Sequence, residues 1–104
     1  MTKILFISPA RKSREMLVAR VMTEARNAGI EIEINTATEK EGLVRLASDE
    51  DVDMILLCPG IRFLLNEPEE VKLLRKVPTI IVSSDVFGSL DAPSLLHTIR
   101  SILI

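Results

Sequence analysis

The chain has 104 residues, of which 47% are hydrophobic and only 3% aromatic, and 13 basic against 15 acidic residues give it a formal net charge of −2. One cysteine and one histidine exclude an internal disulfide and leave too few ligands for a Cys/His zinc site. The slightly acidic balance argues against a nucleic-acid surface, and no apolar run is long enough to cross a bilayer. We therefore expect one cytoplasmic domain over residues 1–104, with no direct insertion into the membrane.

The first third of the chain predicts a strand, a helix and a second strand. Lys3–Ser8 is short and apolar and is followed by Pro9, which cannot donate to a sheet, so it predicts a buried strand that ends at Ser8. Residues 13–28 repeat apolar side chains at helical spacing, and Gly29 suits the left-handed residue that often ends a helix. The strict alternation of Ile30–Ile34 predicts an edge strand with one buried face. The apolar stripe of the helix consists of Leu17, Val18, Val21, Met22, Ala25 and Ala28.

The middle of the chain predicts a short helix, a central strand and a further helix. Thr38–Glu41 has the pattern of a capping box and is followed by apolar residues up to Ala47. Val52–Cys58 is apolar without alternation from Met54 onward, as in a parallel strand that is covered on both faces. Pro68 then opens a helix with acidic residues in its first turn.

The last quarter predicts a fourth strand over Thr79–Ser83, a loop over Asp85–Asp91, and a helix from Pro93 to about Leu103 that Asp91 caps. Strands that alternate with helices indicate an α/β domain with an open, four-stranded parallel sheet between two layers of helices. Because crossovers are right-handed and the second strand has a charged face, we expect the strand order 2-1-3-4.

In such a sheet, ligands bind beyond the carboxyl ends of the strands, where the winding direction changes. That point lies between strands one and three, so the segment after strand one and Cys58 after strand three are the candidate site. The first segment leads into a helix N-terminus and carries three cations and two hydroxyls, which favours an anion such as phosphate. The candidate phosphate-binding residues are Pro9, Ala10, Arg11, Lys12, Ser13 and Arg14, beside Ser8.

Three segments in register resemble the IIB components of the lactose/cellobiose class of the sugar phosphotransferase system. Lys3–Ser8 followed by a helix looks like the first strand and phosphate loop of that family. Leu56–Ile61 is similar to its third-strand pattern Leu-Leu-Gly-Pro-x-Ile, and Phe87–Asp91 to its late Tyr-Gly-x-x-Asp segment. The resemblance runs nearly from end to end of the chain.

The resemblance implies a phosphoprotein that takes a phosphoryl group from a histidine of a IIA component and passes it to the sugar at the membrane component IIC, without metal or organic cofactor. The first loop of the family reads Cys-x-x-Gly-x-Ser-[ST]. In this chain Ser8 stands at the phospho-cysteine position, Arg11 at the glycine and Ser13 at the first serine. A serine hydroxyl needs an adjacent base to act as a nucleophile, whereas a thiol ionises near pH ~8.5, so whether the chain is an active transferase stays open.

Several alternatives remain beside the relay. One alternative is a catalytically silent relative that binds a phosphorylated partner. The spacing of Ser8 and Arg14 also resembles the Cys-x5-Arg loop of low-molecular-weight tyrosine phosphatases, whose arginine clamps phosphate. A receiver-like signalling domain would need an acidic pair where Ser8 and Pro9 stand. In the structural interpretation, Ser8 ends a strand and Cys58 is a core residue. In the functional interpretation, Cys58 is a displaced nucleophile.

Overall fold

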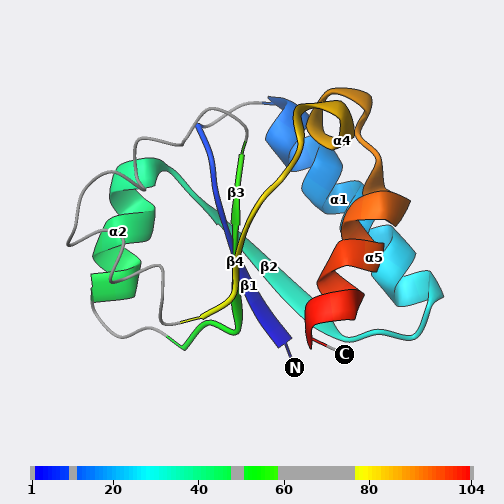
Figure 1. The fold of residues 1–104 in the computed structure, drawn as a ribbon, viewed down its shortest axis with the longest axis horizontal. Helices are drawn as coiled ribbons and strands as arrows, with labels where there is room; N and C mark the ends of the chain where they lie inside the picture. Colours follow the sequence, from blue (N-terminus) through cyan, green and yellow to red (C-terminus); the bar gives the residue numbers. More distant parts are fainter. Residues whose placement is uncertain (1, 10–11, 48–50, 59–76, 104) are drawn as a thin grey trace.

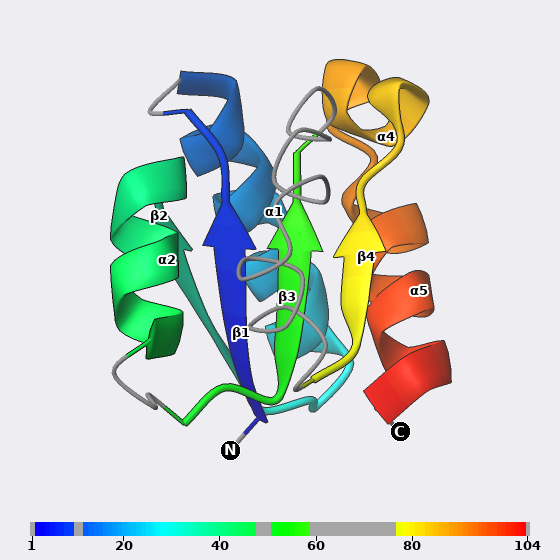
Figure 2. The same cartoon turned by 60° about the vertical axis from the view of Figure 1, so that its left-hand side comes forward.

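A computed structural model describes residues 2–9, 12–47, 51–58 and 77–103 of the chain. The described part forms a four-stranded parallel sheet in the order β2-β1-β3-β4, as predicted (Figure 2). Figure 1 views this sheet edge-on, with α2 on one face and α1, α4 and α5 on the other. The elements are β1 (Thr2–Ile7), α1 (Lys12–Asn27), β2 (Ile32–Ala37), α2 (Glu39–Ala47), β3 (Met54–Leu57), β4 (Thr79–Ile81), α4 (Ser84–Ser89) and α5 (Ala92–Leu103).

The two central strands, β1 and β3, form the middle of the core. Ile4–Ile7 of β1 and Met54–Leu57 of β3 are all buried, which agrees with their unbroken apolar sequences. Because both faces of a central parallel strand are covered by helices, consecutive residues are buried rather than every second one. One face of the sheet packs against the buried stripes of α1 and α5, and the ring of Phe6 meets that of Phe87 edge-on at 6.3 Å.

Helix α1 ends as its sequence predicts, and this ending corrects the predicted start of the next strand. Gly29 has a φ of 70°, its N–H donates to Arg26, and the N–H of Ile30 donates to Ala25 at 2.9 Å. These two bonds form a Schellman motif, so the backbone N–H of Ile30 is bonded to the end of the helix. The strand expected from Ile30 therefore begins at Ile32 and runs to Ala37. Ala28, predicted on the buried stripe, is exposed because it lies beyond the last turn of the helix.

The loop predicted over Asp85–Asp91 is wrong, because its first part is the short helix α4. Ser83 is extended, and its side-chain oxygen accepts a hydrogen bond from the backbone N–H of Val86 at 3.1 Å. This N-cap satisfies one of the free N–H groups of the first turn. The helix ends at Leu90, whose φ of 53° is in the left-handed region. Asp91 then caps α5 through its contact with Ser94, as predicted.

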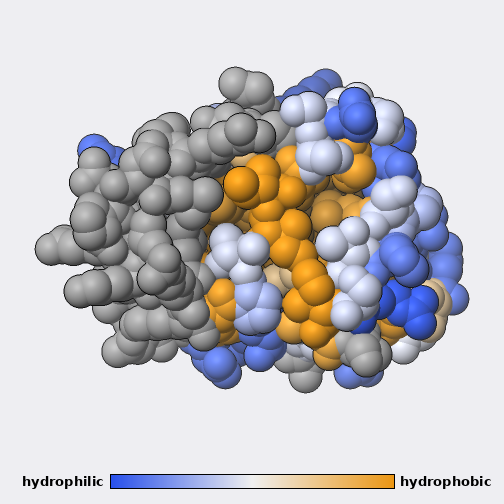
Figure 3. Space-filling model, in the orientation of Figure 1, coloured by the Kyte–Doolittle hydropathy of each residue, from blue (hydrophilic) through white to orange (hydrophobic). Residues whose placement is uncertain are grey.

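Strand β4 forms one edge of the sheet, and it ends at Ile81, two residues before the predicted Ser83. On the face that Figure 1 views, Figure 3 shows apolar side chains at the surface, and Ile81 of β4 is 38% exposed. The helix predicted from Pro68 lies outside the described residues. No helix among the described residues is long and apolar enough to cross a membrane.

Candidate functional site

The carboxyl ends of three neighbouring strands meet the first turns of α1 and α2. Beyond β1, the N–H of Ser8 donates to the carbonyl of Ala37 on β2 at 2.9 Å. Beyond β3, the N–H of Cys58 donates to the carbonyl of Ile7 at 3.1 Å. These bonds continue the ladders of the sheet, so the residues after the three strands lie side by side. The predicted neighbours Ser8 and Cys58 are therefore brought together.

Ser8 is buried, with none of its surface exposed. Its hydroxyl donates to the carbonyl of the next residue, Pro9, at 3.1 Å. A nucleophilic serine needs a base within hydrogen-bond reach of that hydroxyl. Among the described residues, no carboxylate or imidazole is hydrogen-bonded to the Ser8 hydroxyl. In this arrangement the hydroxyl is bonded to the backbone that follows β1.

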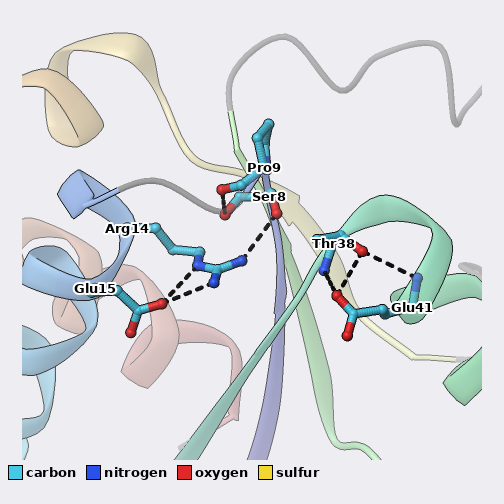
Figure 4. A network of polar contacts seen from close by, with 6 residues as sticks. All are labelled: Ser8, Pro9, Arg14, Glu15, Thr38 and Glu41. Carbon is cyan, nitrogen blue, oxygen red and sulfur yellow. Dashed lines mark hydrogen bonds and ion pairs between the residues drawn. The ribbon is translucent and has the colours of Figure 1, made fainter.

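Arg14 is the buried cation of the site, since only 10% of its side chain is exposed. Figure 4 shows its guanidinium between the end of β1 and the first turn of α1. One end nitrogen, Nη1, donates to the carbonyl of Ser8 at 3.1 Å. The other edge faces Glu15, with Nε at 3.1 Å and Nη2 at 2.9 Å from the same carboxylate oxygen. Three of the five guanidinium N–H groups thus have acceptors among the described residues.

Glu41 brings a second carboxylate to this end of the sheet, through the capping box at the start of α2 (Figure 4). Its side chain accepts hydrogen bonds from the hydroxyl of Thr38 at 2.7 Å and from the N–H of Thr38 at 3.1 Å. In return, the N–H of Glu41 donates to the hydroxyl of Thr38 at 3.4 Å. The side-chain bond to Thr38, followed by the backbone bond and the charges of Arg14 and Arg45, lowers the pKa of Glu41.

A glycine allows α2 to lie close to the end of β1. A side-chain carbon built on Gly42 would be 2.7 Å from Cδ1 and 2.8 Å from Cγ1 of Ile7. These distances are far below van der Waals contact, so only glycine fits without movement. The close approach places the first turn of α2, and with it Glu41, beside the residues that follow β1.

The remaining predicted site residues differ in their exposure. Pro9 and Lys12 are exposed, Ser13 is partly buried, and Cys58 is buried in the core, in line with its structural interpretation. Ala10 and Arg11 lie outside the described residues.

Sequence reasoning missed Glu15 and Glu41 as members of the site. Glu41 was recognised only as part of a capping box, although the strand order already placed the residues after strand two beside those after strand one. For Glu15 the sequence gives no signal beyond an acidic residue in the first turn of a helix. In the structure, one buried guanidinium forms an ion pair with Glu15, and its charge also acts on the carboxylate of Glu41.

No family model matches the sequence, and no curated protein matches it significantly. Solved structures do match. The lactose-specific IIB component domain of the phosphoenolpyruvate:carbohydrate phosphotransferase system from Streptococcus pneumoniae is 13% identical, with a TM-score of 0.75 over 99% of this chain and 98% of that one. The cellobiose-specific phosphotransferase IIB component from Borrelia burgdorferi is 26% identical, with a TM-score of 0.73 over 97% of this chain and 91% of that one.

Both matches extend over nearly the whole of each chain, so the similarity includes the sheet, its strand order and the helices on both faces. The resemblance predicted from three sequence segments is confirmed at the level of the fold. This chain is structurally similar, over nearly its full length, to IIB components of lactose- and cellobiose-specific phosphotransferase systems.

Proposed function

We propose that this chain is a IIB-type component of a sugar phosphotransferase system of the lactose/cellobiose class. It works in the cytoplasm beside a IIA and a IIC component, and it meets the phosphorylated IIA component with the surface around Ser8 and Arg14. The observation that carries the proposal is the end-to-end similarity to two IIB components. The position of a buried arginine where strands β1 and β3 end supports the choice of surface.

The relay of a phosphoryl group is the first form of this function. Its chemistry would form a bond between the Ser8 oxygen and phosphorus, break the N–P bond of a phosphohistidine, and move the hydroxyl proton to the released imidazole. For this step the hydroxyl would have to leave the Pro9 carbonyl and emerge from a fully buried position.

The second form is a silent IIB-type domain that binds the phosphorylated partner without taking its phosphoryl group. The burial of Ser8, together with its bond to Pro9, favours this form. It keeps the docking surface and the anion-binding arginine while dispensing with the nucleophile.

Intact mass after incubation with phosphoenolpyruvate, the general phosphotransferase proteins and a IIA component of this class separates the two forms. We expect no phosphoryl adduct on the chain and a retained complex with phosphorylated IIA. An adduct that disappears in Ser8→Ala would establish the relay, and one that disappears only in Cys58→Ala would make the buried thiol the acceptor. If the chain neither acquires a phosphoryl adduct nor forms a complex with phosphorylated IIA, the proposal as a whole is overturned.

A gain-of-function variant sharpens this test. Ser8→Cys restores the thiol at the family's position, but Cys58 follows the neighbouring strand at the same level. Two cysteines there would lie about 5 Å apart between their Cα atoms, within the range of a disulfide. Ser8→Cys should therefore be made in a Cys58→Ala background, with Cys58→Ala alone as its control. An adduct on the double variant would identify the site as a silenced acceptor.

A further inference from the structure

The guanidinium of Arg14 is held in a fixed orientation. Arg14 precedes Leu17, Val21 and Ala25 at helical spacing, so it is on the buried stripe of α1. Its Nη1 is tied to the Ser8 carbonyl at 3.1 Å, and the side chain is 10% exposed. The opposite edge, Nε with Nη2, is the edge by which arginine grips two oxygens of a carboxylate or a phosphate. This edge is therefore preorganised for an oxyanion.

Glu15 occupies that edge. Both donors converge on one of its carboxylate oxygens, at 3.1 and 2.9 Å. Adjacent residues of a helix do not face each other, so the side chain of Glu15 bends back to reach Arg14 (Figure 4). The Glu15 side chain is 61% exposed, so water would solvate its carboxylate once it let go. A half-exposed ion pair of this kind is weak and exchangeable.

We propose that Glu15 is an internal competitor that sets the affinity of this site for phosphoryl oxyanions. The incoming group takes the Nε–Nη2 edge of Arg14 with two oxygens, while the Glu15 carboxylate swings into solvent. The ligand chemistry is that of a phosphoryl dianion, whether free phosphate or the phosphorylated side chain of a partner. For the phosphorylated partner this inference rests on the proposed function, whereas for free phosphate it does not.

The charges around Arg14 explain why the competitor matters. With Glu15 in place, the positive charge of Arg14 is already paired with one carboxylate, and it also acts on the charge of Glu41. A dianion entering this arrangement is repelled. When Glu15 turns away, the anion meets a buried cation with free fork donors. The site then discriminates between anions by how tightly they bind Arg14, since an anion that binds it weakly does not displace Glu15.

The test is a titration of the folded protein with inorganic phosphate, followed by the NMR signal of the Arg14 Nε–H. We expect Glu15→Gln to bind phosphate about two- to tenfold more tightly than the unmodified chain, because one competing charge is removed. Glu24→Gln is the matched control, since it removes the same charge from the same helix, nine positions further along. It should leave the affinity unchanged.

Three results would overturn the inference: equal affinities for the unmodified chain and Glu15→Gln, an equal gain in Glu24→Gln, or binding that leaves the Arg14 Nε–H signal unmoved. Arg14→Lys keeps the charge without the fork, and we expect it to abolish the gain from Glu15→Gln in the double variant. A second arm replaces phosphate by phosphorylated IIA. A gain with phosphate but no IIA binding would keep this inference and reject the proposed function.

Discussion

The contact between Gly42 and Ile7 gives a sharp test of how α2 is placed beside the site. In most helices a glycine-to-alanine change is stabilising by about 1 kcal/mol, because glycine is a poor helix former. At Gly42 the added methyl group would lie 2.7 Å from Cδ1 and 2.8 Å from Cγ1 of Ile7. Ile7 is itself fully buried, so its side chain has little room to withdraw.

The sign of the effect follows from comparing these terms. Overpacking a well-filled core costs about 1–3 kcal/mol, and forcing Ile7 off its rotamer is part of that cost. After the gain in helix propensity, Gly42→Ala should lower the free energy of unfolding by about 1 kcal/mol. Gly88→Ala is the control, because nothing lies within 4 Å of a carbon built there. It should raise the free energy of unfolding by about 0.5–1 kcal/mol.

Urea denaturation, followed by far-ultraviolet circular dichroism, measures both changes. Ile7→Val removes the nearer of the two clashing atoms, so in the double variant the cost of Gly42→Ala should shrink. If Gly42→Ala stabilises the protein as much as Gly88→Ala does, the close approach of α2 to the end of β1 is wrong. The placement of Glu41 near Arg14 would then lose its support.

Three further predictions concern the elements around the site. Ser83→Ala should lower the free energy of unfolding by about 1 kcal/mol through loss of the α4 cap, and Ser84→Ala, its neighbour, by clearly less; equal effects in urea denaturation would contradict the cap. Folding lowers the pKa of Glu41. Its ionised carboxylate therefore contributes fully to the free energy of unfolding above the ordinary pKa of 4.5, and this contribution is lost as the pH falls through the pKa in the folded state. The urea midpoints of the unmodified chain and Glu41→Gln should thus converge below pH 4.5, and a constant gap would refute this. Ser8→Cys should form a disulfide with Cys58 in oxidised glutathione, seen as a loss of free thiol, and two persistent thiols would contradict the strand register.

The fold was predictable because its signals are local and agree with one another. The unbroken apolar runs of β1 and β3 predict central strands, and the charged face of β2 places that strand at an edge. The helix α4 was missed because its glycine and serines are typical of a loop. In the structure, the N–H of Val86 donates to the side chain of Ser83 and caps the helix. The start of β2 was misplaced because a Schellman motif takes up Ile30, although the alternating pattern already begins there.

The site was predictable in position but not in its contacts. Strand order alone brings Ser8 and Cys58 together. Arg14 was predicted as a loop cation, yet it is the first member of the buried stripe that continues at Leu17. Its helical spacing was overlooked because charged residues are seldom buried. The pairing of Arg14 with Glu15 could not be predicted, because neighbouring residues on a helix ordinarily point apart.

The central claim is that the phosphorylated IIA component binds where β1 ends. Its most direct test is a map of backbone amide shifts in this chain on adding phosphorylated IIA, with unphosphorylated IIA as the control. We expect the shifts to concentrate at Ser8, Lys12–Arg14 and Thr38–Glu41, and to be larger with the phosphorylated partner. Shifts centred on α5, or no difference between the two forms of IIA, would contradict the account.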